Sequence, residues 1–372
     1  MKIANGHEII QLFESWSPKS YAMEDDSVGL QIGKLNYPVQ QVLVTLDVTL
    51  EVVKEAIERN CQMIIAHHPP IYRPLKNVRT DSPAGEMLEL CIKHDISVYA
   101  AHTNLDVAPG GVNDLLAEAL DLQQIEVLEE TYAESMMKLS VYVPTTDANH
   151  LRSGLAAAGA GHIGQYDNCS FSALGTGRFK PLEGSNPVIG ELNSLEEVSE
   201  EKVEVVFASS LQTKIGKAMF AHHPYEEVAY DLWPLSSKTG QQGIGRVGVL
   251  ENPMTLDSFA AHVKKQLNVP FVRIVGDANA TVKKVAVLGG DGNKYIYKAK
   301  RAGADVFVTG DLYFHVAQDA QALGLSVIDP GHHVESIMKS GVSEKMNRLC
   351  KKKKFECTFI PSSLSTEPFR IL

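Results

Sequence analysis

Histidine and acidic side chains stand at a few points of the sequence, each at or just beyond the end of a short apolar run. Such groups follow the runs MIIA (63–66), VYAA (98–101), VFVTG (306–310) and SVID (326–329). Imidazole nitrogens and carboxylate oxygens together suit zinc, iron or manganese, and they need no thiolate. The sequence therefore predicts a metal site, and its candidate residues are His67, His68, His102, Asp106, Asp311, His332 and Glu335.

Two pairs within this set have spacings with a geometric meaning. His67 and His68 are adjacent, and adjacent side chains of an extended segment point in opposite directions. This pair therefore suits two metal ions, or a bent backbone, better than one tight chelate. His332 and Glu335 are three residues apart at a predicted helix start, so both can face one point.

The motif Ala-His-His-Pro occurs twice, at residues 66–69 and again at 221–224. In the second copy, His222 and His223 follow a predicted helix at 211–220, and Pro224 favours extended geometry before it. A cationic side chain is also favourable near a helix C-terminus. We predict that the second copy is a structural turn and that only the first copy belongs to a metal site.

The elements that position the candidate residues alternate between strand and helix. Predicted strands at 40–46, 63–66 and 96–101 are separated by predicted helices at 50–59 and 85–94. This alternation indicates βα units around a buried parallel sheet. Ligands of open α/β sheets bind outside the carboxyl ends of the strands. If the strands are neighbours in one sheet, the polar groups that follow them converge in one crevice.

The same order of elements returns later in the chain, with predicted strands at 283–292, 305–311 and 325–335 and helices at 293–302 and 315–323. We therefore predict an α/β fold made of two related α/β halves. Between them, residues 138–235 read as strand, helix, strand, strand, helix, strand, which is the ferredoxin-like α+β pattern. The predicted domains are 1–130 and 242–372, which together form one metal-binding domain, and an insert at 131–241.

Other features narrow the class of protein. The net charge of -10 argues against non-specific nucleic-acid binding, and the basic run 351–354 is typical of a solvated face. Five cysteines without a C-x-x-C pair fit neither a disulfide framework nor a thiolate metal site. We see no signal-like segment and no apolar run of membrane-spanning length, so we expect a cytoplasmic protein.

Two loops contain polar or flexible residues without a definite role. The segment Gly289–Gly292 lacks the full G-x-G-x-x-G spacing, so it predicts a tight turn or a close approach of substrate to the backbone. Asp25, Asp26, Tyr72 and Lys76 are polar loop residues for which solvent exposure is as good an explanation as function.

The segments MEDDSVGLQIG, IIAHHPPIY, AAHTNLD, VFVTGDLYFH and IDPGHHVE occur in this order. Together they resemble the dinuclear-metal-centre proteins, the NIF-three-like family often named GTP cyclohydrolase 1 type 2 homologues. The resemblance covers both outer halves, most of the chain apart from the insert. The segment HHPYEEVAYDL of the insert resembles the trimer-forming PII/CutA-like domain that some bacterial members of this family contain.

The resemblance implies two divalent metal ions per chain, zinc first and iron or manganese as alternatives. It implies that the ligands are His67, His68, Asp106, His332 and Glu335. Many members place one more residue between the ligand histidine and glutamate than GHHVE does, so the ligand is His332 or His333. We favour His332, which directly follows the glycine. His102 and Asp311 are assigned to support of the ligands or to proton transfer. The resemblance also implies a homohexameric toroid whose sites face an internal cavity.

Two functions of different classes fit these predictions. The first is a di-metal-dependent hydrolase acting on a nucleotide or a related small molecule, because two cations can activate a water and stabilise an oxyanion. The second is a non-catalytic metal-binding or regulatory protein with a ligand-sensing insert. The hydrolase requires an open coordination position and a route for substrate, whereas the second function predicts full ligation by protein. Neither a membrane nor a nucleic acid is expected as partner.

Overall fold

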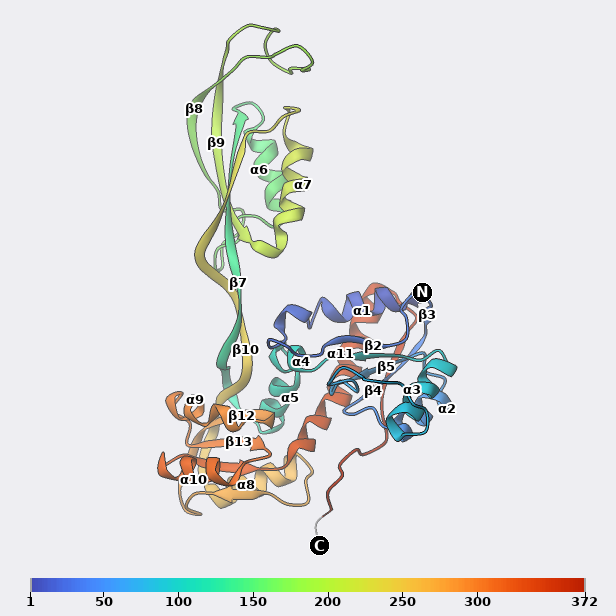
Figure 1. Ribbon diagram of the computed structural model, residues 1–372. Helices are drawn as coiled ribbons and strands as arrows, with labels where there is room; N and C mark the ends of the chain where they lie inside the picture. Colours follow the sequence, from blue (N-terminus) through green and yellow to red (C-terminus); the bar gives the residue numbers. More distant parts are fainter. Residues whose placement is uncertain (1, 371–372) are drawn as a thin grey trace. The chain divides into compact units, whose positions relative to one another are not determined.

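The computed structural model describes residues 2–370 and shows a mixed α/β protein (Figure 1). The chain divides into two compact units. The first unit combines Met1–Tyr132 with Gln242–Leu372, and the second unit is Ala133–Gln241. In the described part of the chain, no helix is both long and apolar enough to cross a membrane.

The first unit contains a five-stranded sheet in the order β15, β4, β5, β6, β2. These strands are β15 (Thr358–Pro361), β4 (Gln41–Thr45), β5 (Met63–Ala66), β6 (Ser97–Ala100) and β2 (Gly29–Ile32). All are parallel except β2, which lies antiparallel to β6 at the edge. The helices α2 (Leu50–Glu58) and α3 (Pro83–Lys93) connect the parallel strands and pack with one face of the sheet. The predicted strands and helices of the first half are therefore confirmed to within a few residues.

The second half of the first unit builds a separate sheet around three parallel strands, β12 (Thr281–Asp291), β13 (Val306–Gly310) and β14 (Ser326–Asp329). They are connected through η3 (Asn293–Tyr295) with α9 (Ile296–Arg301), and through α10 (Phe314–Ala322). At the two sides β11 (Arg273–Val275) and β10 (Tyr230–Thr255) pair antiparallel with β14 and β12. The condition that all strands share one sheet is therefore not met, because the two halves form two sheets.

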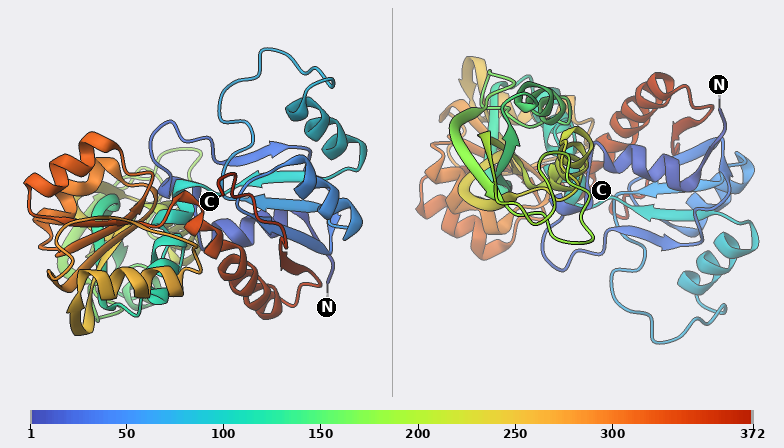
Figure 2. Two further views of the ribbon diagram at one scale, coloured as in Figure 1. Left: turned by 90° about the horizontal axis from the view of Figure 1, so that it is seen from below. Right: turned by 90° about the horizontal axis from the view of Figure 1, so that it is seen from above.

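One hydrophobic core joins the two sheets. Val42 of β4 and Val285 of β12 belong to the same buried cluster, together with Leu116 and Val342. The last two come from α5 (Val112–Ala119) and α11 (Met338–Lys353), which pack on each other. Figure 2 shows α11, in red, beside the blue strands of the first sheet, and it packs on β4 and β15. Strands buried on both faces explain the continuous apolar runs of the sequence.

The remaining short elements of the first unit frame these two sheets. They are β1 (Ala4–Asn5), α1 (Gly6–Glu14), η1 (Lys19–Tyr21), β3 (Pro38–Val39), α4 (Thr103–Val107), α8 (Leu256–Gln266) and η4 (His332–Ile337). Two of them, α4 and η4, follow the carboxyl ends of the parallel strands β6 and β14.

The second unit has the predicted order of elements. It comprises part of β7 (Gln123–Pro144), then α6 (Ala148–Ala157), β8 (Phe171–Phe179), β9 (Glu196–Ala208), η2 (Ser209–Leu211), α7 (Gln212–His222) and part of β10. The strand predicted at 138–144 is only the end of β7, and the one at 228–235 is only the start of β10. Both strands run without a break between the two units. The helices α6 and α7 lie side by side on one face of the strands (Figure 1).

Candidate metal centre

Six side chains from both halves of the first unit meet where the two sheets present their carboxyl ends. His67 and His68 directly follow β5, where the backbone bends. His102 follows β6 and begins α4, which contains Asp106. His332 and Glu335 lie on η4, which follows β14. The predicted convergence of strand ends therefore takes place across two sheets instead of along one.

The carboxylate of Glu335 lies at the centre of this cluster. Its Oε2 is 3.0 Å from His68 Nε2, 3.1 Å from His332 Nε2 and 3.7 Å from His67 Nε2. Asp106 Oδ1 is also 3.7 Å from His67 Nε2. Three overlapping groups have ligand atoms close enough to hold an ion: His67, His68 and His102; His68, His332 and Glu335; and His67, Asp106 and Glu335.

The other ring nitrogen of each histidine is held by an oxygen that can only accept a hydrogen bond. His67 Nδ1 donates to the carbonyl oxygen of Ala101 over 2.9 Å. The other three donate to carboxylates: His68 to Asp47 (2.7 Å), His102 to Asp26 (2.8 Å) and His332 to Asp311 (2.7 Å). Such contacts fix the tautomer and orientation of metal-ligating histidines. The geometry leaves every Nε2 as the atom that each ring offers to the cluster.

Two of the innermost polar atoms have no hydrogen-bond partner. His67 is fully buried, and its Nε2 and Asp106 Oδ1 are both unsatisfied within the described residues. Their separation of 3.7 Å is too long for a hydrogen bond. Buried polar atoms are almost always paired, so this arrangement needs an additional group. A cation between nitrogen and oxygen donors would satisfy both atoms, so these residues fit a metal ion.

Electrostatics in the cluster favour protonated histidines as long as no other cation is present. Burial opposes the charged form of His68, but the hydrogen bonds that it donates to Asp47 and Glu335 outweigh burial and raise the pKa of His68 to about 10. The hydrogen bond to Glu335 is the main cause that raises the pKa of His332 to about 9. Burial raises the pKa of Asp106 to about 6. The cluster therefore attracts positive charge, which protons or metal ions can supply.

The glycine-rich turn after β12 makes room for the central carboxylate. A Cβ atom on Gly290 would lie 2.6 Å from Glu335 Oε1 and 3.3 Å from His332 Nε2. Gly290 also has a φ of 63°, which disfavours other residues. At Gly289 a Cβ would lie 3.0 Å from Glu335 Cγ. The side chain of Glu335 thus occupies the space beside this turn, where a close approach of substrate is one of the two predictions for the segment.

The structure distinguishes between the two histidines of GHHVE. His332 directs Nε2 to Glu335 and His68, at 3.1 and 3.3 Å. His333 belongs to none of the three groups, and burial lowers its pKa. The ring centroid of His102 lies 5.2 Å from that of His67. Asp311 Oδ2 lies 2.7 Å from His332 Nδ1, on the side of the ring away from Glu335.

Asp26 and Asp47 were not assigned a role from the sequence. Burial would raise the pKa of Asp26, but hydrogen bonds from His102 and Thr103 lower it to about 2. Asp47 lies just beyond β4, and its pKa is lowered in the same way by His68 and Thr366. Asp47 could have been found, since it ends the first strand of a βα unit whose next two strands end in histidine. Asp26 carries no comparable signal.

The second Ala-His-His-Pro motif has the structural role predicted for it. His223 Nε2 donates to the carbonyl oxygen of Tyr142 over 2.8 Å, and its Nδ1 accepts from the Tyr225 amide over 3.1 Å. Both ring nitrogens are therefore occupied. His222 donates from Nδ1 to the Ala218 carbonyl oxygen within α7, and its ring packs against Gly154. The two histidines therefore hold the end of α7 against β7 and α6.

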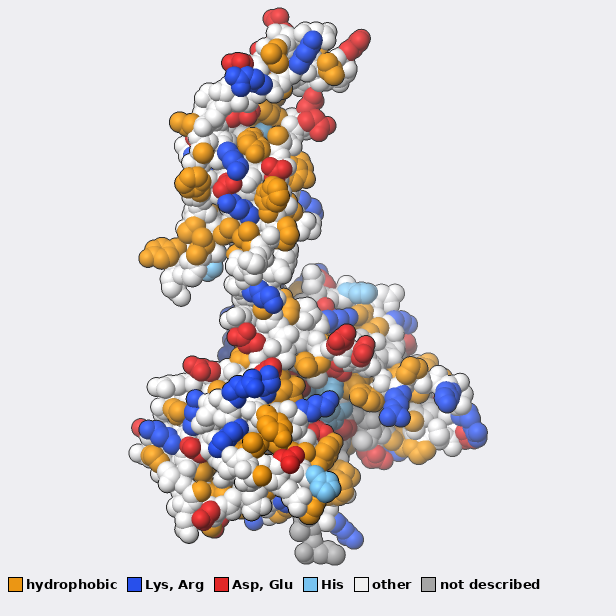
Figure 3. Space-filling view, turned by 60° about the vertical axis from the view of Figure 1, so that its left-hand side comes forward, with side chains coloured by type: hydrophobic (Ala, Val, Ile, Leu, Met, Phe, Trp, Pro, Cys, Tyr) orange, Lys and Arg blue, Asp and Glu red, His pale blue; other side chains and the backbone are white. Residues whose placement is uncertain are grey.

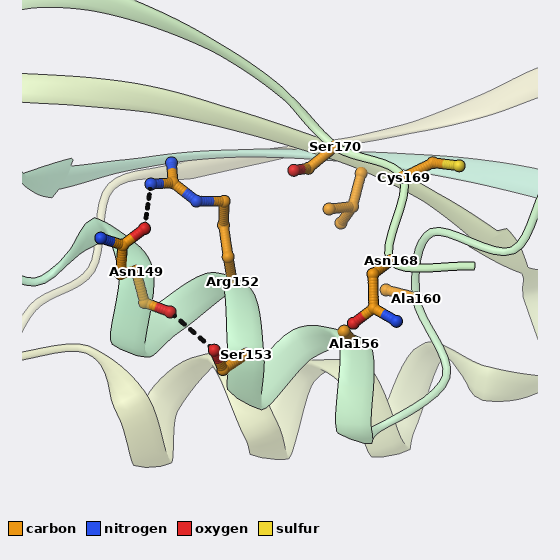
Figure 4. A pocket seen from close by; sticks show the side chains of 9 residues that line it. Asn149, Arg152, Ser153, Ala156, Ala160, Asn168, Cys169 and Ser170 are labelled. Atoms are coloured by element: carbon orange, nitrogen blue, oxygen red, sulfur yellow. Dashed lines mark hydrogen bonds between the residues drawn. The ribbon is translucent and has the colours of Figure 1, made fainter. Parts of the chain in front are cut away.

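A cavity of about 300 Å³ lies in the second unit, between α6 and the segment before β8 (Figure 4). Arg152 is its charged residue, and it already donates to Glu201, Ser172 and Asn149 at 2.6 to 2.8 Å. The other lining residues are Asn149, Ser153, Ala156, Ala160, Asn168, Cys169, Ser170 and Val205. With its cation paired, this cavity offers no chemistry comparable to the cluster in the first unit.

The chain is similar to known proteins over its whole length. The family described as Duf34/NIF3 (NGG1p interacting factor 3) matches residues 4–368. A Bacillus subtilis protein named GTP cyclohydrolase 1 type 2 homolog is 58% identical over 371 residues, with 100% of both chains covered. The crystal structure of a Bacillus cereus protein related to NIF3 has a TM-score of 0.94 at 55% identity, and that of a Staphylococcus aureus protein 0.83 at 32%, each over 100% of both chains. The chain therefore belongs to the Duf34/NIF3 family.

Proposed function

We propose that the cluster holds two divalent metal ions and that the protein is a metal-dependent hydrolase of a nucleotide or a related small molecule. The observation that carries this proposal is a set of four histidines whose Nδ1 atoms are all tied to oxygens. The Nε2 atoms of three of them, His67, His68 and His332, lie 3.0 to 3.7 Å from buried carboxylate oxygens. Histidines on a protein surface have no reason to share one orientation. In metal sites, by contrast, the ligand histidines typically bind an oxygen through the ring nitrogen that does not face the metal.

The donor set divides into two ion positions that share Glu335. The inner position consists of His67, Asp106 and Glu335, and the outer position of His68, His332 and Glu335. All donors are nitrogen or oxygen atoms, which suits zinc, and also iron or manganese. The two positions differ in access, because the side chain of His67 is 0% exposed and that of His332 is 40% exposed. Substrate would reach the outer position.

The chemistry supplied by two such ions is a lowered pKa of bound water and stabilisation of an oxyanion. The protein adds a proton carrier beside them. His102 is partly exposed and held at Nδ1 by Asp26, so its Nε2 can accept and return a proton at the cluster. A nucleotide as substrate is supported by the name of the Bacillus subtilis relative, GTP cyclohydrolase 1 type 2 homolog.

We also propose that the second unit is a ferredoxin-like, PII/CutA-like domain inserted at 131–241. The strand order β10, β7, β9, β8 and the position of both helices on one face support this proposal. Its edge strand β8 exposes Phe171 (67%) and Leu174 (78%), and Figure 3 shows such apolar side chains on the surface of this unit. Exposed apolar edges are typical of interfaces, which supports a homo-oligomer, and we propose a hexameric toroid. The free cysteines fit a cytoplasmic location.

The deciding experiment is the metal content per chain, measured by elemental analysis of protein purified without added metal. We expect about two equivalents of metal, and a clear loss in His68→Ala and Glu335→Gln. His94→Ala is the matched control, because His94 is an exposed histidine of the same unit outside the cluster. Wild-type protein that is metal-free and does not load from dilute zinc, iron or manganese would refute the metal centre. Hydrolysis of nucleotides by the loaded protein, absent in Glu335→Gln, tests the activity.

A further inference from the structure

The residues that follow β15 are fastened to the first sheet by a series of hydrogen bonds. The amide of Ser362 extends the β15–β4 ladder by donating to the Val44 carbonyl oxygen over 2.8 Å. The hydroxyls of Ser362 and Ser363 both donate to the buried carboxylate of Glu55 on α2, at 2.5 and 2.8 Å. Lys339 Nζ donates to the Leu364 carbonyl oxygen over 2.9 Å. We call residues 362–366 the strap.

The strap ends in a contact with the metal cluster. The Thr366 hydroxyl donates to Asp47 Oδ2 over 2.5 Å, and the other oxygen of the same carboxylate accepts from His68 Nδ1 over 2.7 Å. The hydroxyl and the imidazole thus occupy opposite oxygens of one carboxylate. Because Asp47 is bound from both sides, its plane cannot rotate without breaking one of the two bonds.

The neighbouring residues of the strap lack this connection. Ser365 and Glu367 are exposed, and the hydrogen bond between them is a local one, from the Glu367 amide to the Ser365 hydroxyl. Thr366 is partly buried and is the residue through which the strap reaches Asp47. Its position therefore serves the carboxylate and not the packing of a hydrophobic core.

We propose that Thr366 is a positioning residue of the outer ion position, acting through Asp47 on His68. The Thr366–Asp47–His68 chain fixes the ring of His68 with Nε2 directed at Glu335. Through the strap, the α2 carboxylate of Glu55 and the β15 ladder set the geometry of this one ligand. His67 receives no such support, because its Nδ1 is held by the Ala101 backbone. The inference rests on the proposed metal centre. It implies that a change at Thr366 weakens metal binding at the outer position and leaves the inner position unchanged.

The test compares Thr366→Val, which keeps the shape and removes the hydroxyl, with Thr366→Ser, which keeps the hydroxyl. Ser365→Ala is the matched control on the exposed neighbour. Zinc affinity is measured for each full-length protein by competition with a chromophoric chelator, and the two binding steps are resolved. Removing an outer partner of a metal-ligating histidine weakens metal affinity by about 10- to 100-fold. We expect a loss at the lower end of this range, about 10-fold, for one zinc ion in Thr366→Val, because Asp47 itself is retained. We expect wild-type affinity for both ions in Thr366→Ser and Ser365→Ala.

Each other outcome contradicts the proposal in a distinguishable way. Equal weakening of both zinc ions in Thr366→Val, or an equal loss in Thr366→Ser, would show that the strap acts only on general packing. Unchanged binding in Thr366→Val would show that Asp47 holds His68 without it. A wild-type protein that binds no zinc would refute the metal centre itself. Thermal unfolding of the metal-free proteins, expected to be equal for Thr366→Val and Ser365→Ala, verifies that the folds are intact.

Discussion

A histidine offers a metal ion one ring nitrogen, and the partner of the other nitrogen decides which. In this protein three carboxylates and one carbonyl oxygen make that choice for His67, His68, His102 and His332. In the metal-free cluster, His68 and His332 still hold a proton on Nε2, because each faces the carboxylate of Glu335. Metal binding must therefore displace protons.

This displacement predicts how affinity depends on pH. The raised pKa values, about 10 for His68 and about 9 for His332, mean that both rings are charged in the metal-free protein at pH 7. Zinc affinity should keep rising from pH 6 to above pH 8, by about tenfold per pH unit for each displaced proton. Chelator competition across this range measures it. Histidines with an ordinary pKa would instead give a plateau from about pH 7, and such a plateau would contradict the assignment.

A second prediction concerns the space beside Glu335. Gly290→Ala places a methyl group 2.6 Å from Glu335 Oε1 at a φ of 63°. Gly110→Ala has a similar φ of 72° but meets no atom within 4 Å, so it is the matched control for backbone strain. Both variants should lose about 1 kcal/mol of unfolding free energy, measured in urea. Only Gly290→Ala should lose metal; equal metal contents would show that Glu335 adapts freely.

At this scale the sequence indicates the residues of the cluster better than the residues that support them. The strand ends point to His67, His102 and His332 because parallel strands present their carboxyl ends at one edge of each sheet. Asp26 stands on an irregular loop, and nothing in a loop's sequence tells which histidine it will meet. Thr366 is still harder to find from the sequence, because it contacts Asp47 and not the histidine itself.

Among the elements, the helix α5 contacts both the cluster and the strand β10, in which the chain re-enters the first unit. Asn113 of α5 donates to the Asp106 carbonyl oxygen and accepts from the Gly289 amide, at 3.0 and 2.9 Å. Its neighbour Asp114 holds both sides of the Arg246 guanidinium, at 2.5 and 2.9 Å. Arg246 is 3% exposed and lies on β10. The ion pair thus fixes β10 to the helix that carries part of the cluster's frame.

Breaking this pair should be costly. Asp114→Asn leaves a buried guanidinium without its counter-charge, for which we expect a loss of about 3–5 kcal/mol in unfolding free energy. Urea unfolding followed by circular dichroism measures the loss. Glu118→Gln, an exposed acid on the same helix, is the control and should change little. If Asp114→Asn is as stable as the control, the carbonyl oxygens of Gly243 and Gly245 suffice to hold Arg246.

The alternation of elements was predictable because buried parallel strands have a strong apolar signal. The long strands β7 and β10 were recognised only in part, since their burial changes along their length from buried to exposed residues. The joining of two sheets into one site was not predictable either. The spacing of apolar residues shows which face of a strand is buried. It does not show which other element packs against that face.

In the molecule as a whole, every residue of the cluster belongs to the first unit, although the second unit interrupts its sequence. In the first unit, β7 and β10 are neighbours, and Gly243 lies directly against the backbone of Glu129. Replacing residues 133–241 by the hairpin turn Asn-Gly should therefore leave the first unit folded.

We expect the shortened protein to retain the metal content of the full chain, as measured by elemental analysis. The same deletion combined with Glu335→Gln provides the control and should be depleted of metal. A folded but metal-free shortened protein would show that the second unit is needed for the site. In that case the insert could not be regarded as an independent domain.

The strand β15 has a consequence for synthesis on the ribosome. It covers one edge of β4, yet residues 358–361 leave the ribosome long after residues 41–45. At roughly 5–20 residues per second, the nascent first sheet waits for tens of seconds with an apolar edge unpaired. Open edges of this kind pair readily with other chains. During translation the β4 edge is therefore open to pairing with other chains, whereas β15 covers it in the finished protein.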